Sequence, residues 1–371
     1  MMTGRCRNIL SFFALGTLLL SAGCNQPEGA LPETRTPFDP DLYAWKTASW
    51  TPFTVSDSVR DFVYGAEDGV YVAVSSGGVI AWSADGDVWE RALVYEDPGA
   101  KIPVPFSASY NAAAYGDGSF VAVANGGKAA YSRDGKVWTG IDQITGFGNT
   151  NINGIAWGKA GNTPYFVAVG ENANIARSAT GATWAGGSAS GFLNGSTNIQ
   201  LNDIVYGDGY FYVAGDNGYT GYSDNPKDLA GWKPWQYVDP FHGNNIKKIA
   251  FGKYGDENGL ALVFEEWGGK RLALGTVKMF TDRSGWDSDL DAGNLGNNYI
   301  DDIAFGGGYF VVAGASAMIG YWPCANPSDN AGRYWRALSF SEFQWWEITA
   351  LAACKDRFFA GGIGGKIGYS K

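Results

Sequence analysis

Three aspartates share one position in a repeated pattern of the chain. Asp61, Asp203 and Asp302 each lie four residues before a glycine that follows an aromatic residue. If the strands that carry them surround a common opening, the three carboxylates face one another and can bind a cation or a polar ligand. The alternative, which we favour, is that each aspartate accepts backbone N–H bonds at the end of its own strand.

Composition and charge exclude several kinds of site. His242 is the single histidine among 371 residues, which excludes a zinc site built from several histidines. The net charge is −10, so the chain lacks the basic surface that nucleic-acid binding requires. We therefore expect no nucleic-acid partner, no cofactor and no metal site, and we expect His242 to be a solvated loop residue.

Aromatic side chains in three long connections form a second candidate site. These connections span residues 95–110, 236–245 and 339–346, and they carry Phe106, Phe241, Phe343 and Trp345. If they gather on one face, the four rings form a patch that can bind a protein or a glycan. Aromatic residues in such connections also fold inward to seal the contacts between repeats, and the sequence leaves both interpretations open.

The elements that must position these residues form one unit repeated seven times. An aromatic residue followed by glycine recurs at Gly65, Gly116, Gly158, Gly207, Gly252 and Gly306, and Cys354 takes the seventh position. The spacing averages about 48 residues, which is typical of propeller blades. Apolar runs rich in β-branched and aromatic residues follow each anchor. The sequence predicts an all-β, seven-bladed β-propeller with four-stranded antiparallel blades over residues 42–371.

The two ends of the chain predict how the ring closes. The chain stops at Gly368–Lys371, where a third strand should lead into a fourth. Ala48–Val55 matches the fourth-strand segments that begin at Trp89 and Trp138, with Trp50 as the equivalent ring. We expect this N-terminal strand to complete the seventh blade and cover its open edge. A linear stack of sheets is the alternative.

A short motif, Ser-x-Asp-Gly-x-x-Trp, joins the third and fourth strands of the first blades. It comprises Ser83, Asp85 and Trp89, then Ser132, Asp134 and Trp138, then Ser178 and Trp184 with Thr180 in place of the aspartate. Its polar residues can bond the backbone of a tight hairpin, glycine supplies a positive φ, and tryptophan anchors the next strand. The motif resembles the Asp box of sialidase-like propellers and of photosystem II assembly-factor-like propellers, in which it is structural.

The resemblance to sialidases raises the question of catalysis. A sialidase-like glycosidase needs an arginine cluster for the sugar carboxylate, a general acid and a tyrosine nucleophile. No Arg-Ile-Pro motif opens the first blade here, and the arginines are spread thinly over the repeats. We expect the protein not to be an enzyme.

The first 24 residues have the order of an export signal. Arg5 and Arg7 precede an apolar run, residues 9–20, that is too short to span a bilayer. Leu19–Cys24 resembles the lipobox of bacterial lipoproteins, with Ser21 where leucine is usual. The resemblance implies removal of residues 1–23 and lipidation of Cys24, for example with palmitate, and ordinary signal cleavage is the alternative. Residues 24–41 then form a proline-rich tether.

The folded body holds two further cysteines, Cys324 and Cys354. In an oxidising compartment they can form a disulfide, and the sequence leaves that pairing open. Two separate buried thiols are the favoured interpretation, because the two positions differ in their distance from the centre of the ring.

Together these features predict a lipid-anchored protein of the bacterial cell envelope, on the extracytoplasmic side of the outer or the cytoplasmic membrane. Its monomeric body is expected to be a non-catalytic binding or assembly scaffold for a protein or glycan partner. The alternatives are a sialidase-like glycoside hydrolase and a purely structural envelope protein. Clustered arginines in the funnel would favour the hydrolase, whereas an exposed aromatic patch would favour partner binding.

Overall fold

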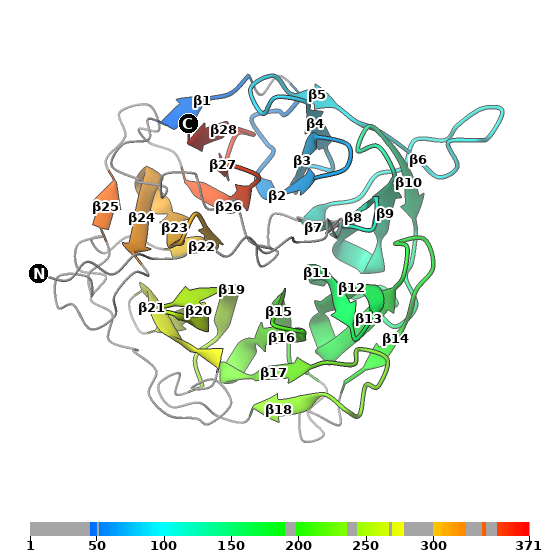
Figure 1. Ribbon diagram of the computed structural model, residues 1–371. Helices are drawn as coiled ribbons and strands as arrows, with labels where there is room; N and C mark the ends of the chain where they lie inside the picture. The colour runs from blue at the N-terminus through cyan, green and yellow to red at the C-terminus, as the bar shows by residue number, and fades with distance from the viewer. Residues whose placement is uncertain are drawn as a thin grey trace, which may run out of the picture.

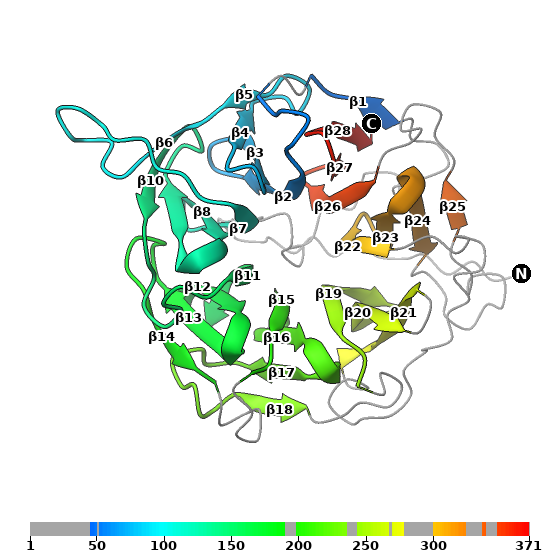
Figure 2. The same ribbon diagram turned by 180° about the vertical axis from the view of Figure 1, so that it is seen from behind.

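Seven β-sheets surround a central axis in the computed structural model (Figure 1). The structure describes residues 45–49, 52–189, 198–235, 243–266, 269–277, 300–323, 336–338 and 347–370. In each sheet the first strand lies nearest the centre and the last strand lies at the rim, as both views show (Figures 1 and 2). The predicted seven-bladed β-propeller with small antiparallel blades is confirmed.

The four strands of a blade follow the same order around the ring, with two departures: β6 (Leu93–Tyr95) adds a fifth strand to the rim of blade 2, parallel to β10, and three strands of blade 5 are described. The inner strands of blades 1 to 7 are β2 (Val59–Gly65), β7 (Tyr110–Gly116), β11 (Ile152–Ala160), β15 (Leu201–Gly207), β19 (Ile246–Tyr254), β22 (Ile300–Gly306) and β26 (Ile348–Cys354). The second strands are β3 (Val70–Ser75), β8 (Ser119–Ala124), β12 (Thr163–Gly170), β16 (Tyr210–Gly215), β20 (Glu257–Glu266), β23 (Tyr309–Gly314) and β27 (Arg357–Gly362).

The third strands are β4 (Ile80–Ser83), β9 (Ala129–Ser132), β13 (Asn174–Ser178), β17 (Thr220–Ser223), β21 (Gly269–Thr276), β24 (Met318–Pro323) and β28 (Ile367–Ser370). The outer strands are β5 (Glu90–Arg91), β10 (Val137–Ile141), β14 (Ala185–Ser188), β18 (Lys233–Trp235), β25 (Arg336–Leu338) and β1 (Trp45–Thr47). Short 3₁₀ turns join second to third strands at η1 (Asn125–Gly127), η2 (Glu171–Ala173), η3 (Asp216–Gly218) and η5 (Ala315–Ala317). No helix among the described residues is long and apolar enough to cross a membrane.

The alternating strand directions give the ring two distinct faces. Turns from second to third strands, such as Ser76–Val79, share one face with the connections between blades, such as 52–58 and 105–109. We call this the crown face. Turns from third to fourth strands, which contain the Ser-x-Asp-Gly-x-x-Trp motifs, lie on the opposite face, here called the Asp-box face.

The two ends of the chain meet in blade 7. Strand β1 pairs antiparallel with β28, with Trp45 opposite Ser370 and Thr47 opposite Gly368, so the N-terminal strand supplies the missing outer strand. The predicted position of that strand, Ala48–Val55, was wrong, because the chain bends away at Ser49 to bridge Val88 of blade 1. Trp45, 4% exposed, is the buried ring of this strand. Trp50 lies outside the described residues.

The recurring glycine creates room between neighbouring blades. A Cβ added at Gly116 would collide with the ring of Trp157 in the next blade, and the same holds for Gly158 with Tyr206. Gly207 and Gly252 make equivalent contacts with Phe251 and Phe305 of the following blades. The aromatic residue and the glycine of the repeat are therefore two halves of one contact, made between successive blades.

Blade 7 carries Cys354 at the anchor position. Cys354 is 2% exposed and disulfide-bonded, so the interpretation of this residue as a separate thiol was wrong. Cys324 lies outside the described residues.

The Asp-box hairpins are held by their own polar groups. The hydroxyl oxygens of Ser83 and Ser132 accept bonds from the turn glycine N–H at 2.8 and 3.0 Å. The carboxylate of Asp134 accepts two more backbone N–H groups at 2.8 and 2.9 Å, and Asp85 does the same in blade 1 at 2.8 and 3.0 Å. In blade 3, Ser178 keeps its bond, but Thr180 receives one N–H at 3.4 Å.

The motif tryptophans anchor these hairpins. Trp89, Trp138 and Trp184 each donate their indole N–H to the carbonyl of the turn glycine, at 3.2, 2.9 and 2.8 Å. Trp89 and Trp138 are almost fully buried, whereas Trp184 is partly exposed. The indole thus satisfies its one donor while its ring fills the interior.

Replacing Trp138 tests which part of the motif stabilises the fold. Trp138→Ala should lower the free energy of unfolding by about 3 to 5 kcal/mol, because it removes a fully buried ring. Asp134→Ala should cost about 1 to 2 kcal/mol through the loss of turn hydrogen bonds at a partly exposed site. Denaturant melts of both variants measure the two costs, and the reverse order would show that the polar contacts dominate.

Two deletions test the ring closure. Removing residues 25–41 should leave the stability of the body unchanged, since this segment precedes the first strand. Removing residues 25–55 should cause aggregation, because it strips β1 from β28 and exposes an unpaired strand edge. The measurements are size-exclusion chromatography and thermal melting. A monomer from the longer deletion that melts like the shorter one would contradict closure by β1.

Candidate functional site

Every inner strand contains a β-bulge near its start, at the crown face. The pairing register slips by one residue at Arg60 in blade 1, and at the equivalent residue of each other blade. A bulge changes the direction of consecutive residues, so the bulge residue and the residue after it both lie near the mouth of the funnel. The bulge residues are Arg60, Asn111, Asn153, Asn202, Lys247, Asp301 and Thr349, and the residues after them are Asp61, Ala112, Gly154, Asp203, Lys248, Asp302 and Ala350.

The three predicted funnel aspartates occupy the position after the bulge in blades 1, 4 and 6. One carboxylate oxygen of each accepts the N–H of the next residue, at 2.7 Å for Asp61 and 2.9 Å for Asp203 and Asp302. The other oxygen accepts a backbone N–H of the following blade, from Ala113 at 2.9 Å, Ile249 at 3.0 Å and Leu351 at 2.7 Å. Each carboxylate therefore fastens one blade to the next.

Lys248 of blade 5 brings the three aspartates into one electrostatic cluster. Its ammonium lies 3.5 Å from the carboxylate of Asp302, whose side chain is 7% exposed. Burial disfavours the charged ammonium, but the carboxylates of Asp302, Asp203 and Asp61 outweigh it and raise the pKa of Lys248. Lysine is thus the cation of this cluster. Among the described residues, no group of three potential ligand side chains is placed to hold a metal ion.

Burial also changes the acidity of the aspartates. Desolvation raises the pKa of Asp61 to about 7 and that of Asp203 to about 6, although Lys248 and the backbone N–H bonds act in the opposite direction. The same causes raise the pKa of Asp302. The arrangement is close to the favoured alternative from the sequence, in which the aspartates accept backbone N–H groups. It differs because half of these bonds cross to the neighbouring blade.

The bulge residues form a second set of clamps that the sequence analysis missed. Asn111, Asn153 and Asn202 donate side-chain N–H bonds to inner-strand carbonyls of the next blade, at 2.8, 2.8 and 2.7 Å. Thr349 donates its hydroxyl to the carbonyl of Val59 at 2.7 Å, which links blade 7 to blade 1. The sequence could have revealed these clamps, because all four residues lie five positions before the repeat anchor.

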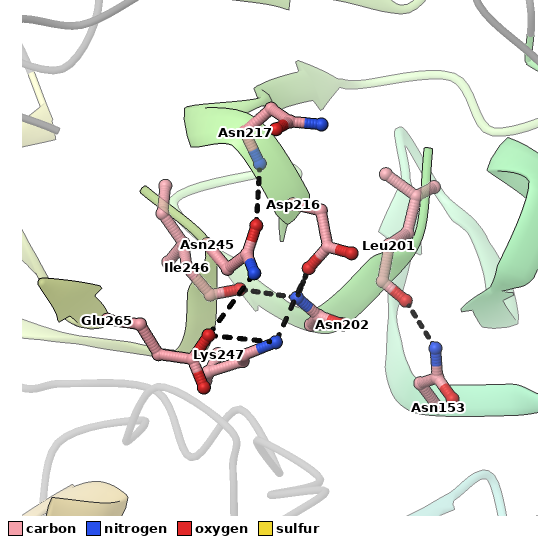
Figure 3. Close-up of polar contacts among 9 residues, drawn as sticks. All are labelled: Asn153, Leu201, Asn202, Asp216, Asn217, Asn245, Ile246, Lys247 and Glu265. Carbon is pink, nitrogen blue, oxygen red and sulfur yellow. Dashed lines mark hydrogen bonds and ion pairs between the residues drawn. The ribbon is translucent and has the colours of Figure 1, made fainter. Parts of the chain in front are cut away.

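The seam between blades 4 and 5 carries a polar network on the crown face (Figure 3). Asn202 donates to Asp216 at 2.9 Å, and the ammonium of Lys247 lies 3.4 Å from the same carboxylate. Lys247 also lies 3.5 Å from Glu265, which accepts a bond from Asn245 at 3.2 Å. Figure 3 shows these side chains turned toward one another. They serve as mutual partners, so the network is a structural brace.

The predicted aromatic patch is only partly within the described residues. Phe106 is half-buried, and a Cβ added at Gly140 would collide with its ring, so the ring packs against strand β10. The ammonium of Lys128 lies 5.1 Å from the ring centroid. Of the two interpretations left open, Phe106 follows the inward one. Phe241, Phe343 and Trp345 lie outside the described residues, as does His242.

Comparison with known proteins identifies the architecture. No protein-family model matches the chain, and no curated protein is similar to it. Among solved structures, YCF48 from Cyanidioschyzon merolae is similar with a TM-score of 0.60 at 17% identity, over 88% of this chain and 98% of that one. YCF48 bound to D1 peptide is similar with a TM-score of 0.59 at 11% identity, over 90% and 98%.

A propeller of different function is equally similar. Catalytically inactive virginiamycin B lyase from Staphylococcus aureus with quinupristin has a TM-score of 0.61 at 12% identity, over 89% of this chain and 99% of that one. The shared property is the propeller fold. The resemblance of the sequence to assembly-factor-like propellers is supported at the level of the fold.

The raised pKa of Asp61 predicts a pH dependence of stability. In the unfolded chain this carboxyl loses its proton near pH 3.8, whereas the folded protein retains the proton up to about pH 7. The free energy of unfolding should therefore fall as the pH rises between these values, because the folded state binds the extra proton. In Asp61→Asn the fall should be smaller by about 1 to 3 kcal/mol.

Urea unfolding of both proteins at several pH values between about 4 and 7 measures the difference. The pH slope is the readout, since the amide also removes an acceptor from a backbone N–H and changes stability at every pH. Parallel curves would show that Asp61 ionises near its ordinary pKa in the folded protein.

Proposed function

We propose that this protein is a non-catalytic scaffold that binds a protein partner on its crown face. The observation that carries this proposal is that the polar groups of the funnel bond to the protein's own backbone. The carboxylates of Asp61, Asp203 and Asp302 are bonded to backbone N–H groups on both sides of three seams. Groups engaged in this way hold the ring rigid, and a rigid ring with irregular connections on one face is suited to binding.

The inner strands argue against the hydrolase alternative. A sialidase-like site needs several arginines that converge on the sugar carboxylate. In the seven described inner strands Arg60 is the single arginine. The bulge positions that face the mouth in blades 2, 3 and 4 carry asparagine, and all three are bonded to neighbouring backbone.

A peptide-bound relative in fold supports a protein partner over a glycan. The structure of YCF48 bound to D1 peptide shows that a propeller of this shape holds a polypeptide segment in that protein. In the present protein, Phe106 packs inward, which removes one ring from the surface that a glycan would use.

The proposed location is the bacterial cell envelope, with the lipid on Cys24 as the anchor. Strand β1 begins at Trp45, opposite Ser370 at the Asp-box end of β28, and runs toward the crown face. The proline-rich segment 24–41 would therefore join the body at the Asp-box face. This arrangement leaves the crown face free to meet a partner.

Photo-crosslinking in the native envelope tests the proposal. Benzoylphenylalanine in place of Val55, which is 92% exposed on the crown face, should capture a discrete protein in the full-length chain. The matched control is the same substitution at Val88, which is 56% exposed within the Asp-box hairpin of blade 1. Several-fold more crosslinked product at Val55 is the expected result.

A second arm tests the anchor. Cys24→Ala should abolish labelling by radioactive palmitate and release the exported protein in soluble form. Equal capture at Val55 and Val88 would refute the crown face as the binding surface. Retained labelling in Cys24→Ala would refute the anchor without affecting the binding proposal.

A further inference from the structure

A depression of about 440 Å³ opens on the crown face at the seam between blades 1 and 2. It is bordered by the turn from β3 to β4, by the connection that enters β7 and by the turn from β8 to β9. Most of its lining residues are small, and they include Ser76, Gly78, Ser107, Ser109 and Gly126, with Lys128 as the one charged residue. No acidic residue and no aromatic residue is part of the lining.

The buried Asp57 holds the blade 1 side of this depression in place. Asp57 is 2% exposed, and its carboxylate accepts the backbone N–H and the hydroxyl of Thr54 at 2.6 and 3.0 Å. A side chain at Gly77 would collide with that carboxylate. The carbonyl of Asp57 accepts the N–H groups of Gly364 and Gly365 in blade 7, at 2.8 and 3.0 Å. The surface beside the depression is thus fixed by contacts from blade 1 and blade 7.

This seam differs from its neighbours in the bulge residue. At four other seams an asparagine or threonine in the bulge donates to the carbonyl of the next blade. At the seam between blades 1 and 2 the bulge residue is Arg60, which is exposed and makes no hydrogen bond or ion pair with the residues the structure describes. Arg60 lies two residues after Ser58, whose N–H bonds the hydroxyl of Ser76 in the lining.

Further groups in the depression are available to a ligand. The hydroxyls of Ser107 and Ser109 bond to no other residue in the described part of the chain. The ammonium of Lys128 lies 5.1 Å from the ring centroid of Phe106 and 3.1 Å from Asp142, whose side chain is 86% exposed and can turn into solvent at little cost. Above Gly126, at φ +68°, a Cβ would meet nothing within 4 Å, so another chain can approach its backbone closely.

We propose that this depression binds a short, extended, acidic peptide segment. The serine hydroxyls match the donors and acceptors of an extended main chain, and the charges of Arg60 and Lys128 match carboxylate side chains. The protein as a whole carries a net charge of −10, which repels anions at long range. Recognition of an acidic segment therefore depends at short range on Lys128 in the lining and on Arg60, which lies outside the lining at the same seam. This inference rests on the proposed function and names the chemistry of the partner segment.

Selection from a phage-displayed library of random seven-residue peptides tests it with the full-length protein. The enriched peptides should be rich in Asp and Glu. Binding of the enriched peptides should fall at least about tenfold in Arg60→Ser and in Lys128→Gln, which is roughly the loss of one charged contact each. Arg133→Gln, on the Asp-box face, is the matched control and should leave binding unchanged. Arg60 and Arg133 are exposed and Lys128 is half-buried, and thermal melts of the three variants separate a loss of binding from a loss of folding.

Three results would overturn the inference. They are enrichment of peptides without acidic residues, equal losses in Arg133→Gln, and binding of uronic-acid oligosaccharides at the same site in preference to the peptides. Each of these leaves the crown-face proposal intact if Val55 still captures a protein in the envelope. If Val55 captures no protein in the envelope but acidic peptides still bind at the depression, the crown-face proposal fails and the peptide-binding inference stands.

Discussion

The seam between neighbouring blades is the contact on which this ring depends. Backbone pairing runs within each sheet, so the blades are joined mainly by side chains that must pack and bond across seven seams. The aspartate after the bulge does this with one group, because its two oxygens accept N–H groups from two different blades. Apolar contacts complete the seam, as when the ring of Trp157 fills the space left by Gly116. Polar groups give the seam its register, and apolar groups give it most of its free energy.

The cluster at the funnel mouth shows what this use of aspartate requires. Three carboxylates close to one another would repel if all were charged, and burial increases that penalty. Blade 5 supplies the compensating cation, Lys248. Its ammonium lies 3.5 Å from Asp302 and interacts with Asp61 and Asp203 as well. The raised pKa values of Asp61 and Asp203 indicate that one lysine does not compensate the burial fully. A site that already needs its cation and its acceptors for the fold has little capacity left for chemistry.

The sequence was sufficient to predict the fold because the residues that recur in each repeat are those that make the contacts between blades. The aromatic residue and the glycine recur in six blades and Cys354 takes the position of the glycine in the seventh, so counting the anchors gives seven. At four seams the glycine makes room for the aromatic residue of the next repeat. The equivalence of Asp61, Asp203 and Asp302 was likewise visible from their spacing. The partners of these aspartates could not be predicted. Lys248 occupies the same repeat position with a different residue type, and the spacing of the repeats does not indicate which residues pair across the funnel. The edge of blade 7 was misplaced because Trp45 and Trp50 lie only five residues apart, and the pairing of Trp45–Thr47 with β28 decides between them.

At the seam between blades 1 and 2, where the bulge residue forms no clamp, the crown face has room for a ligand. Asparagine and threonine in the bulge are neutral donors of limited reach, and they bond the next blade when placed there. Arg60 is longer and charged, and it extends into solvent at the seam where the depression lies. Asp57 keeps that region ordered from the side of blade 7, so the seam retains its shape without a bulge clamp. One substitution within a structural repeat can therefore convert a clamp into an exposed recognition group, and the surrounding ring supplies the rigidity that recognition needs.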